Sequence, residues 1–96
     1  MIVRVDLATR AVTVVRRDID ALALTIGQSA QGKRLFAGSA RDNTVLSYGI
    51  NSDGTLASDE TVEIKLDEIS TAQDKRPRVL RIDGQGRLYI RASPFD

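Results

Sequence analysis

The feature that most constrains this sequence is a series of short apolar and β-branched runs separated by polar turns. The runs at 34–40 and 44–50 are separated by the turn at 41–43 (RDN), and the turn at 51–54 (NSDG) leads to a third run at 60–66. Runs of this length joined by Gly, Asn and Asp turns are typical of antiparallel strands in a meander.

The same pattern continues on both sides of this stretch. Residues 21–28 could be helix or strand by content, but Gly27 and the polar residues that follow favour a strand ending in a turn. The polar segment 67–76 predicts a loop or a short helical turn before Pro77. The sequence therefore predicts an all-β fold of eight short strands, the others lying at 2–7, 11–17, 79–83 and 87–92.

Composition limits both the core and the classes of function. The 96 residues suit one small domain, and with 4% aromatic residues and no Trp the core must consist of Val, Ile, Leu and Ala. A net charge of +1 does not suggest a nucleic-acid binder. The basic pairs at 16–17 and 33–34 are expected to be solvated at strand edges and turns.

The chain contains neither Cys nor His. These absences exclude disulfides, thiolate chemistry and a Ser-His-Asp triad. The first residues do not resemble a signal peptide, and no apolar run approaches the ~20 residues that span a bilayer. We therefore expect a cytoplasmic protein without a membrane partner.

An internal repeat is visible. Residues 2–7 line up with 45–50, and residues 32–36 line up with 85–89. A spacing of roughly 40 to 55 residues is typical of a four-stranded propeller blade.

Three segments resemble a known blade pattern. They are GKRLFAGS at 32–39, NTVLSY at 43–48 and DGTL at 53–56, and the opening VDLATRAV at 5–12 fits the same pattern. The sequence resembles lactonase-like β-propellers, namely the gluconolactonase or senescence-marker-protein family and the related phosphogluconolactonase type. The resemblance covers most of the chain except 67–76.

The resemblance implies a ring of six or seven blades, each with strands A to D from the axis outward. In these terms the strands of the chain, in sequence order, would be C-D, A-B-C-D and A-B. It would hold half a blade at 1–17, a complete blade at 18–66 and half a blade at 67–96, with neighbouring copies completing the unfinished blades.

The resemblance also implies where a catalytic metal would bind, and this chain departs there. Gluconolactonase-type enzymes hold a divalent metal through a Glu, an Asn and an Asp. Leu24 stands at the Asn position and Arg78 at the Asp position, and the Glu belongs to a blade that this chain lacks. Neither side chain offers an oxygen ligand. No cofactor is expected; the alternative is a divalent metal such as Ca²⁺ or Zn²⁺.

Two other motifs have simpler interpretations. Residues 49–60 match a calcium-binding loop in part, but position one is Gly49 and the flanks are strand-like, so a hairpin turn is favoured. The Gly-rich segment 83–86 lacks the phosphate-loop spacing and is also expected to be a turn.

Charged residues gather in two equivalent D-to-A loops. By the family analogy these loops surround the mouth of the axial channel, where guanidinium groups could bind a small anionic or sugar-like ligand. The alternative is that these are solvated loop charges, and Asp18 and Asp20 would act as general acid and base only in a cleft that splits their pKa values. The candidate ligand-binding residues are Asp18, Asp20, Lys75, Arg76 and Arg78.

Three functions follow. The first is a structural and binding propeller module without a catalytic centre, which assembles head-to-tail into a ring; three copies would give six blades. The second is a metal-dependent lactone hydrolase that acts as an oligomer or within a longer chain. The third is a monomeric eight-stranded barrel with an apolar cavity.

Overall fold

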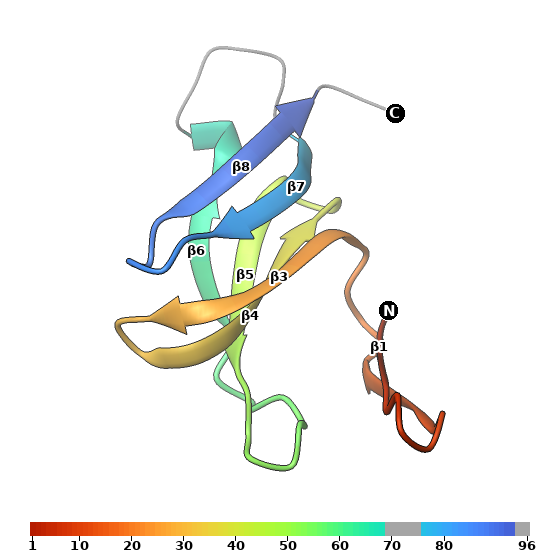
Figure 1. Ribbon diagram of the computed structural model, residues 1–96. Coiled ribbons are helices and arrows are strands. Elements are labelled where there is room, and N and C mark those ends of the chain that lie inside the picture. Colours follow the sequence, from red (N-terminus) through yellow and green to blue (C-terminus); the bar gives the residue numbers. More distant parts are fainter. Residues whose placement is uncertain (69–75, 94–96) are drawn as a thin grey trace.

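The computed structural model describes residues 1–68 and 76–93, and within them the chain forms three antiparallel sheets (Figure 1). The central sheet has four strands in the order β3-β4-β5-β6, while β1-β2 and β7-β8 are separate hairpins. The all-β prediction is confirmed. The elements are β1 (Ile2–Val5), β2 (Val12–Arg16), β3 (Ala21–Ser29), β4 (Gly32–Ser39), β5 (Thr44–Gly49), β6 (Thr61–Lys65), the 3-10 helix η1 (Leu66–Glu68), β7 (Arg76–Ile82) and β8 (Leu88–Ser93).

All eight expected strands are present, and β7 differs most from its expected bounds. It begins at Arg76, inside the stretch predicted to be a loop, and includes Pro77, which is buried. The register shifts between Pro77 and Val79, so the proline lies beside a bulge, where the missing N–H is tolerated. The expected short helical turn is η1. The rest of the predicted loop, including Lys75, and Pro94 lie outside the described residues.

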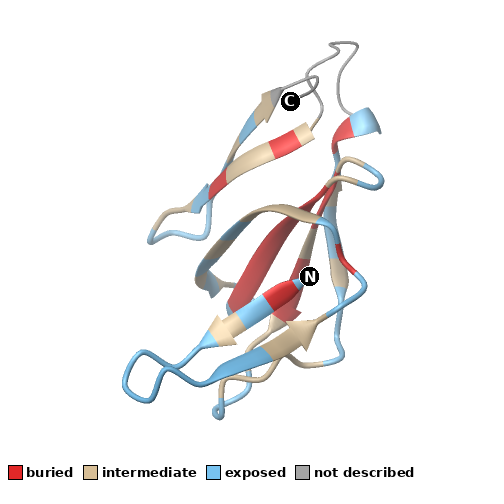
Figure 2. Cartoon of the chain, turned by 90° about the vertical axis from the view of Figure 1, so that its right-hand side faces the viewer, coloured by how far each residue is buried: buried red, intermediate tan, exposed pale blue. Residues whose placement is uncertain are grey.

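The two hairpins cover opposite faces of the central sheet, so the core has two layers of apolar contact (Figure 2). On one face Ile2 and Val15 of β1-β2 pack against Leu35 and Tyr48. On the other face four residues of β7-β8 pack against Phe36 and Val45; they are Leu80, Ile82, Leu88 and Ile90. Alternate residues of β4 and β5 thus contribute to different clusters, as the two-residue period of a strand requires.

The hairpins also cover different halves of the sheet. Arg4 donates to the backbone oxygen of Asp53 at 2.9 Å, and the Arg16 guanidinium lies 4.8 Å from the centre of the Tyr48 ring. The β1-β2 hairpin therefore lies over β5 and the loop that follows it. By contrast, β7 lies along β3 and β4.

Two glycines allow β7 to approach the central sheet closely. A Cβ on Gly27 would lie 2.1 Å from Cγ2 of Ile82, and one on Gly38 would lie 2.6 Å from the backbone oxygen of Pro77. Gly38 pairs with Ala23 near the start of β3, whereas Gly27 lies near its end. Since Pro77 and Ile82 lie near the two ends of β7, strands β3 and β7 run in the same direction.

The segment after β5 is a hairpin loop. Ile50 and Leu56 form a bridge, and Asp53 Oδ1 accepts hydrogen bonds from the N–H and hydroxyl of Thr55. Gly54 has a φ of 86°, which favours glycine. The interpretation of 49–60 as a turn therefore fits the geometry.

One expectation about charge is wrong. Arg34 was expected to be solvated, but it is 3% exposed. Its guanidinium donates to Ser47 Oγ at 2.9 Å, to the Ser47 backbone oxygen at 3.0 Å and to Asp59 Oδ2 at 2.8 Å. These bonds compensate for the loss of hydration and join β4, β5 and the loop before β6.

The barrel alternative is also wrong for this structure. Among the described strands β1 pairs only with β2 and β8 only with β7. The eight strands therefore do not close on themselves.

Candidate functional site

The two acidic candidates lie at the edge of a groove. The groove has a volume of about 480 Å³ and is lined by Asp18 and Asp20, with Ser39 and Thr44 from the central sheet and Glu60 before β6. Ile19, between the two aspartates, is 6% exposed and belongs to the core. Its burial turns the flanking side chains of Asp18 and Asp20 outward toward the groove.

Arg16 organises one wall of this groove. Its guanidinium donates to both carboxylate oxygens of Asp18, at 3.0 and 3.1 Å, and lies 3.5 Å from Glu60 Oε1. The same oxygen of Glu60 accepts a 2.6 Å bond from the Tyr48 hydroxyl. Arg16 lowers the pKa of Asp18, while burial and the bond to Glu60 raise the pKa of Tyr48. The Tyr48 hydroxyl therefore stays protonated and acts as a donor.

Carboxylates outnumber cations along this groove. Three cations, Arg16, Arg41 and Lys65, line it together with six carboxylates. This balance favours a cationic or neutral ligand over an anion. The carboxylates are those of Asp18, Asp20, Asp42, Glu60, Asp67 and Glu68.

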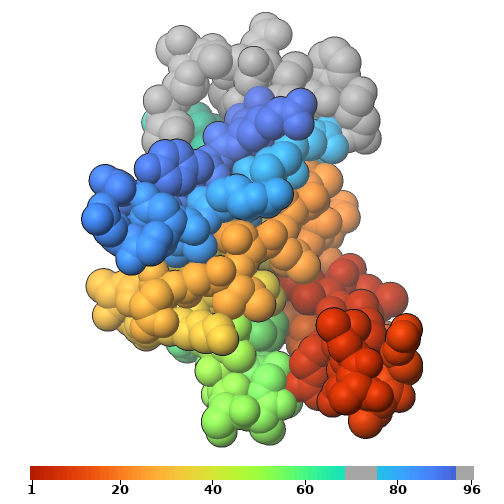
Figure 3. Space-filling model, viewed as in Figure 1, coloured from red at the N-terminus to blue at the C-terminus, as the bar shows by residue number. Residues whose placement is uncertain are grey.

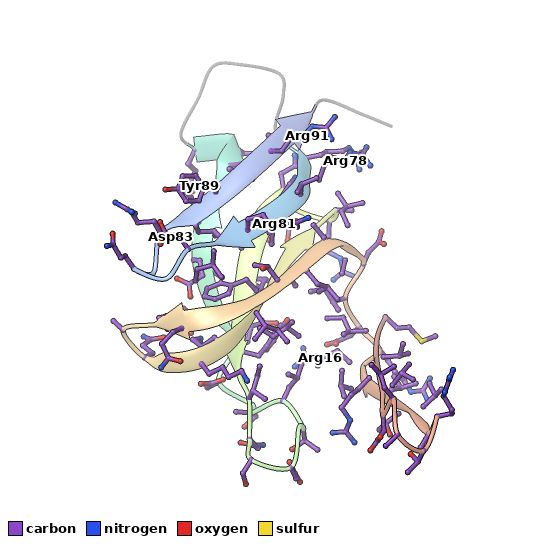
Figure 4. All side chains as sticks on the ribbon, in the orientation of Figure 1. Arg16, Arg78, Arg81, Asp83, Tyr89 and Arg91 are labelled. Carbon is purple, nitrogen blue, oxygen red and sulfur yellow. The ribbon has the colours of Figure 1, made fainter. Side chains whose placement is uncertain are left out.

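The structure does not bring the basic candidates into that groove. Arg76 and Arg78 lie on β7 and are not among the described residues that line it. Figure 4 shows Arg78 on the β7-β8 hairpin, well away from Arg16. Because β3 and β7 run in the same direction, Asp20 before β3 and Arg76 at the start of β7 nevertheless lie at the same end of the molecule. Lys75 lies outside the described residues.

Sequence reasoning missed Arg16, Tyr48 and Glu60 as a connected group. Arg16 and Asp18 are two positions apart at a strand end, which is a usable local signal. The contact to Glu60 spans 44 residues and depends on how the β1-β2 hairpin packs on β5. No local pattern encodes that contact.

Two apolar hollows remain on the central sheet, one on each face. The first, of about 410 Å³, lies between β6 and β8 and includes Phe36, Ile64, Leu88 and Ile90 among its lining residues. The second, of about 520 Å³, includes Leu24, Ile26 and Leu35. Leu24 is 43% exposed and Ile26 is 53% exposed, although both project from the longest strand. Exposed aliphatic side chains of this size mark a surface that another chain segment can cover.

Searches of protein families, curated proteins and solved structures found no match to this chain. The resemblance to lactonase-like propellers therefore stays a prediction. Within residues 1–68 and 76–93 no cluster of three or more Asp, Glu, His or Cys side chains is arranged to hold a metal ion. In the same residues, no helix has the length and apolar character needed to cross a bilayer.

Proposed function

We propose that the chain is a structural and binding β-propeller module that assembles head-to-tail into a ring and has no catalytic centre of its own. The observation that carries this proposal is the placement of the two hairpins around the central sheet. One hairpin covers the β5 side of one face, and the other covers β3 and β4 on the opposite face.

Successive blades of a propeller have this relation. If β3 is the innermost strand, β7 beside it would be the innermost strand of the following blade, with β8 next to it. The β1-β2 hairpin over β5 would be the outer half of the preceding blade. Each hairpin would then lack the two strands that the other supplies, and a second copy could provide them.

The binding role would reside at the end of the molecule where β3 and β7 begin. A ring would bring Asp20 and Arg76 of successive copies around one axis. Groups of both signs there would suit a small polar ligand, such as a sugar-like molecule. Lactone hydrolysis is the weaker candidate, because Leu24 offers a metal no ligand atom.

Light scattering after size-exclusion chromatography tests the assembly. We expect a mass three times the 10.5 kDa of one chain at micromolar concentration or above. A well-folded species of 10.5 kDa across the same concentration range would refute the proposal.

A further inference from the structure

The β1-β2 hairpin presents a face made of four valines. Val3 pairs with Val14 and Val5 pairs with Val12, and residues directly opposite in a sheet project on the same side. The opposite side of the hairpin faces the rest of the chain, because Val15 packs into the core against the central sheet and Arg4 bonds to Asp53 in the loop after β5. Val3 also borders the hollow of Leu24 and Ile26. Val3, Val5 and Val12 are 43%, 45% and 64% exposed.

Polar residues would be expected on a solvated strand face, since a two-stranded hairpin can keep one side in water. Four β-branched side chains instead form an apolar, rigid surface that can pack against another apolar sheet. The hairpin forms a separate lobe away from β7-β8 in Figure 3, so it does not cover the hollow beside β8 in its own chain.

That hollow is the complementary surface. Phe36 and Ile64 of the central sheet and Leu88 and Ile90 of β8 contribute to its walls. It continues the interface that the chain's own β7-β8 hairpin makes with the same face, through Phe36 and Val45. The edge of β8 beside it pairs with no other described strand.

We infer that the valine face of one copy docks into the hollow between β6 and β8 of a second copy, with β1 of the first copy adding to the edge of β8. This inference rests on the proposed assembly and names its interface. The occupant is a second copy because this hairpin has the valine face and because the chain already contains the same interface. Val3 and Val5 align with Leu46 and Tyr48, which pack the central sheet against the chain's own β1-β2 hairpin.

The internal pairing of β4 with β5 also predicts the register. Leu35 pairs with Tyr48, and Ala37 pairs with Leu46. In the internal repeat, residues 32–36 align with 85–89, and residues 2–7 align with 45–50. Continued by one residue to Ile90, this alignment predicts that the corresponding pairs between copies are Leu88 with Val5 and Ile90 with Val3. All four side chains would then face the hollow of the second copy.

Two measurements test the interface. The first compares the association of Val3→Asp and Val12→Asp with the wild type by light scattering over a dilution series. We expect each substitution to weaken association about a hundredfold, since a buried charge without a partner disrupts an apolar contact. Thr13→Asp is the matched control, because Thr13 is exposed and pairs with Arg4 on the side of the hairpin opposite the valines. Circular dichroism checks that each variant stays folded.

The second measurement uses engineered cysteines, since the chain has no Cys of its own. A mixture of Val3→Cys and Ile90→Cys should form a disulfide between copies on oxidation. A mixture of Val3→Cys and Tyr89→Cys should not, because Tyr89 projects from the other face of β8.

The outcomes separate the two proposals. If the wild type is monomeric, both the proposed assembly and the docking of a second copy are overturned. The valine face would then be covered by a segment of a longer chain. A wild type that assembles while Val3→Asp and Val12→Asp associate equally well overturns this interface alone. A cross-link from Tyr89 rather than Ile90 overturns the register. Loss of association in the two valine variants with cross-linking only through Ile90 supports the inference.

Discussion

Arg34 is a buried charged side chain whose loss should weaken the central sheet. Replacing it with methionine keeps an unbranched apolar stem of similar length but removes the guanidinium. Ser47, which is completely buried, would then lose the guanidinium donors to its hydroxyl and its backbone oxygen, while its hydroxyl would keep its bond to Glu63. Thr61 and the loop residue Asp59 would lose their contacts as well.

The magnitude follows from the two bonds to Ser47, because they lie in the interior. Each hydrogen bond from a charged donor contributes about 1.5 kcal/mol or more, so their loss should lower the free energy of unfolding by about 3 kcal/mol. A domain of this size has a total of about 5–14 kcal/mol. The contact with Asp59 adds little to this figure because that carboxylate is 52% exposed.

Urea denaturation followed by circular dichroism measures the change. With a slope of about 1–2 kcal/mol per molar urea, Arg34→Met should lower the midpoint by about 2 M. All samples need one protein concentration, because association contributes to stability. Arg87→Met is the matched control: Arg87 pairs with Asp83 at 2.7 Å but is 64% exposed, so its loss should cost less than about 1 kcal/mol. Equal effects of the two substitutions would refute the reasoning.

Three further outcomes are expected. Gly38→Ala should destabilise the chain by about 1–3 kcal/mol, because the new methyl group meets the backbone of Pro77, whereas Gly84→Ala, with no atom within 4 Å of the added Cβ, should be neutral in the same denaturation assay. Acid should destabilise the fold, because the Gly49 N–H and then Arg34 lower the pKa of Asp59; its contribution is complete above the ordinary pKa near 4 and is lost as pH falls through the lowered value. Thermal melts of Asp59→Asn should therefore depend less on pH in the acid range, and an unchanged dependence would contradict this assignment. Gluconolactone should not be hydrolysed with added Ca²⁺, Zn²⁺ or Mn²⁺, and turnover that EDTA abolishes would favour the lactonase alternative.

The strand pattern was predictable because it depends on local signals. Alternating apolar residues and turns with Asp, Asn and Gly identify each strand, and Gly32 and Gly86 have the positive φ values that such turns require. The bounds of β7 were harder to predict. Proline disfavours a central strand, and the sequence does not show which strands lie beside Pro77. Its burial beside a bulge depends on Gly38, a residue 39 positions earlier in the chain.

Which charged residues are buried and which are exposed could not be predicted from the sequence. Arg34 and Lys33 are adjacent and of the same charge, yet Arg34 is buried and Lys33 is exposed. The alternation of a strand places them on opposite sides, and only the three-dimensional position of Ser47 makes the burial of Arg34 favourable. Likewise Asp18 and Asp20 share a groove, while Arg76 and Arg78 lie on a different hairpin.

The two apolar hollows are not equally suited to a second copy. The outer face of β7-β8, which would meet the hollow of Leu24 and Ile26 in a ring, carries Arg81, Tyr89 and Arg91, and that hollow also contains Arg4 and Lys33. Cations would meet cations there, which weakens the contact. The valine face meets a hollow lined mainly by apolar side chains, with the acidic Glu63 and no cation among its described residues. The free energy of assembly should therefore come mainly from the valines. For this reason, substitutions at Val3 and Val12 distinguish this interface from nonspecific association of the exposed sheet.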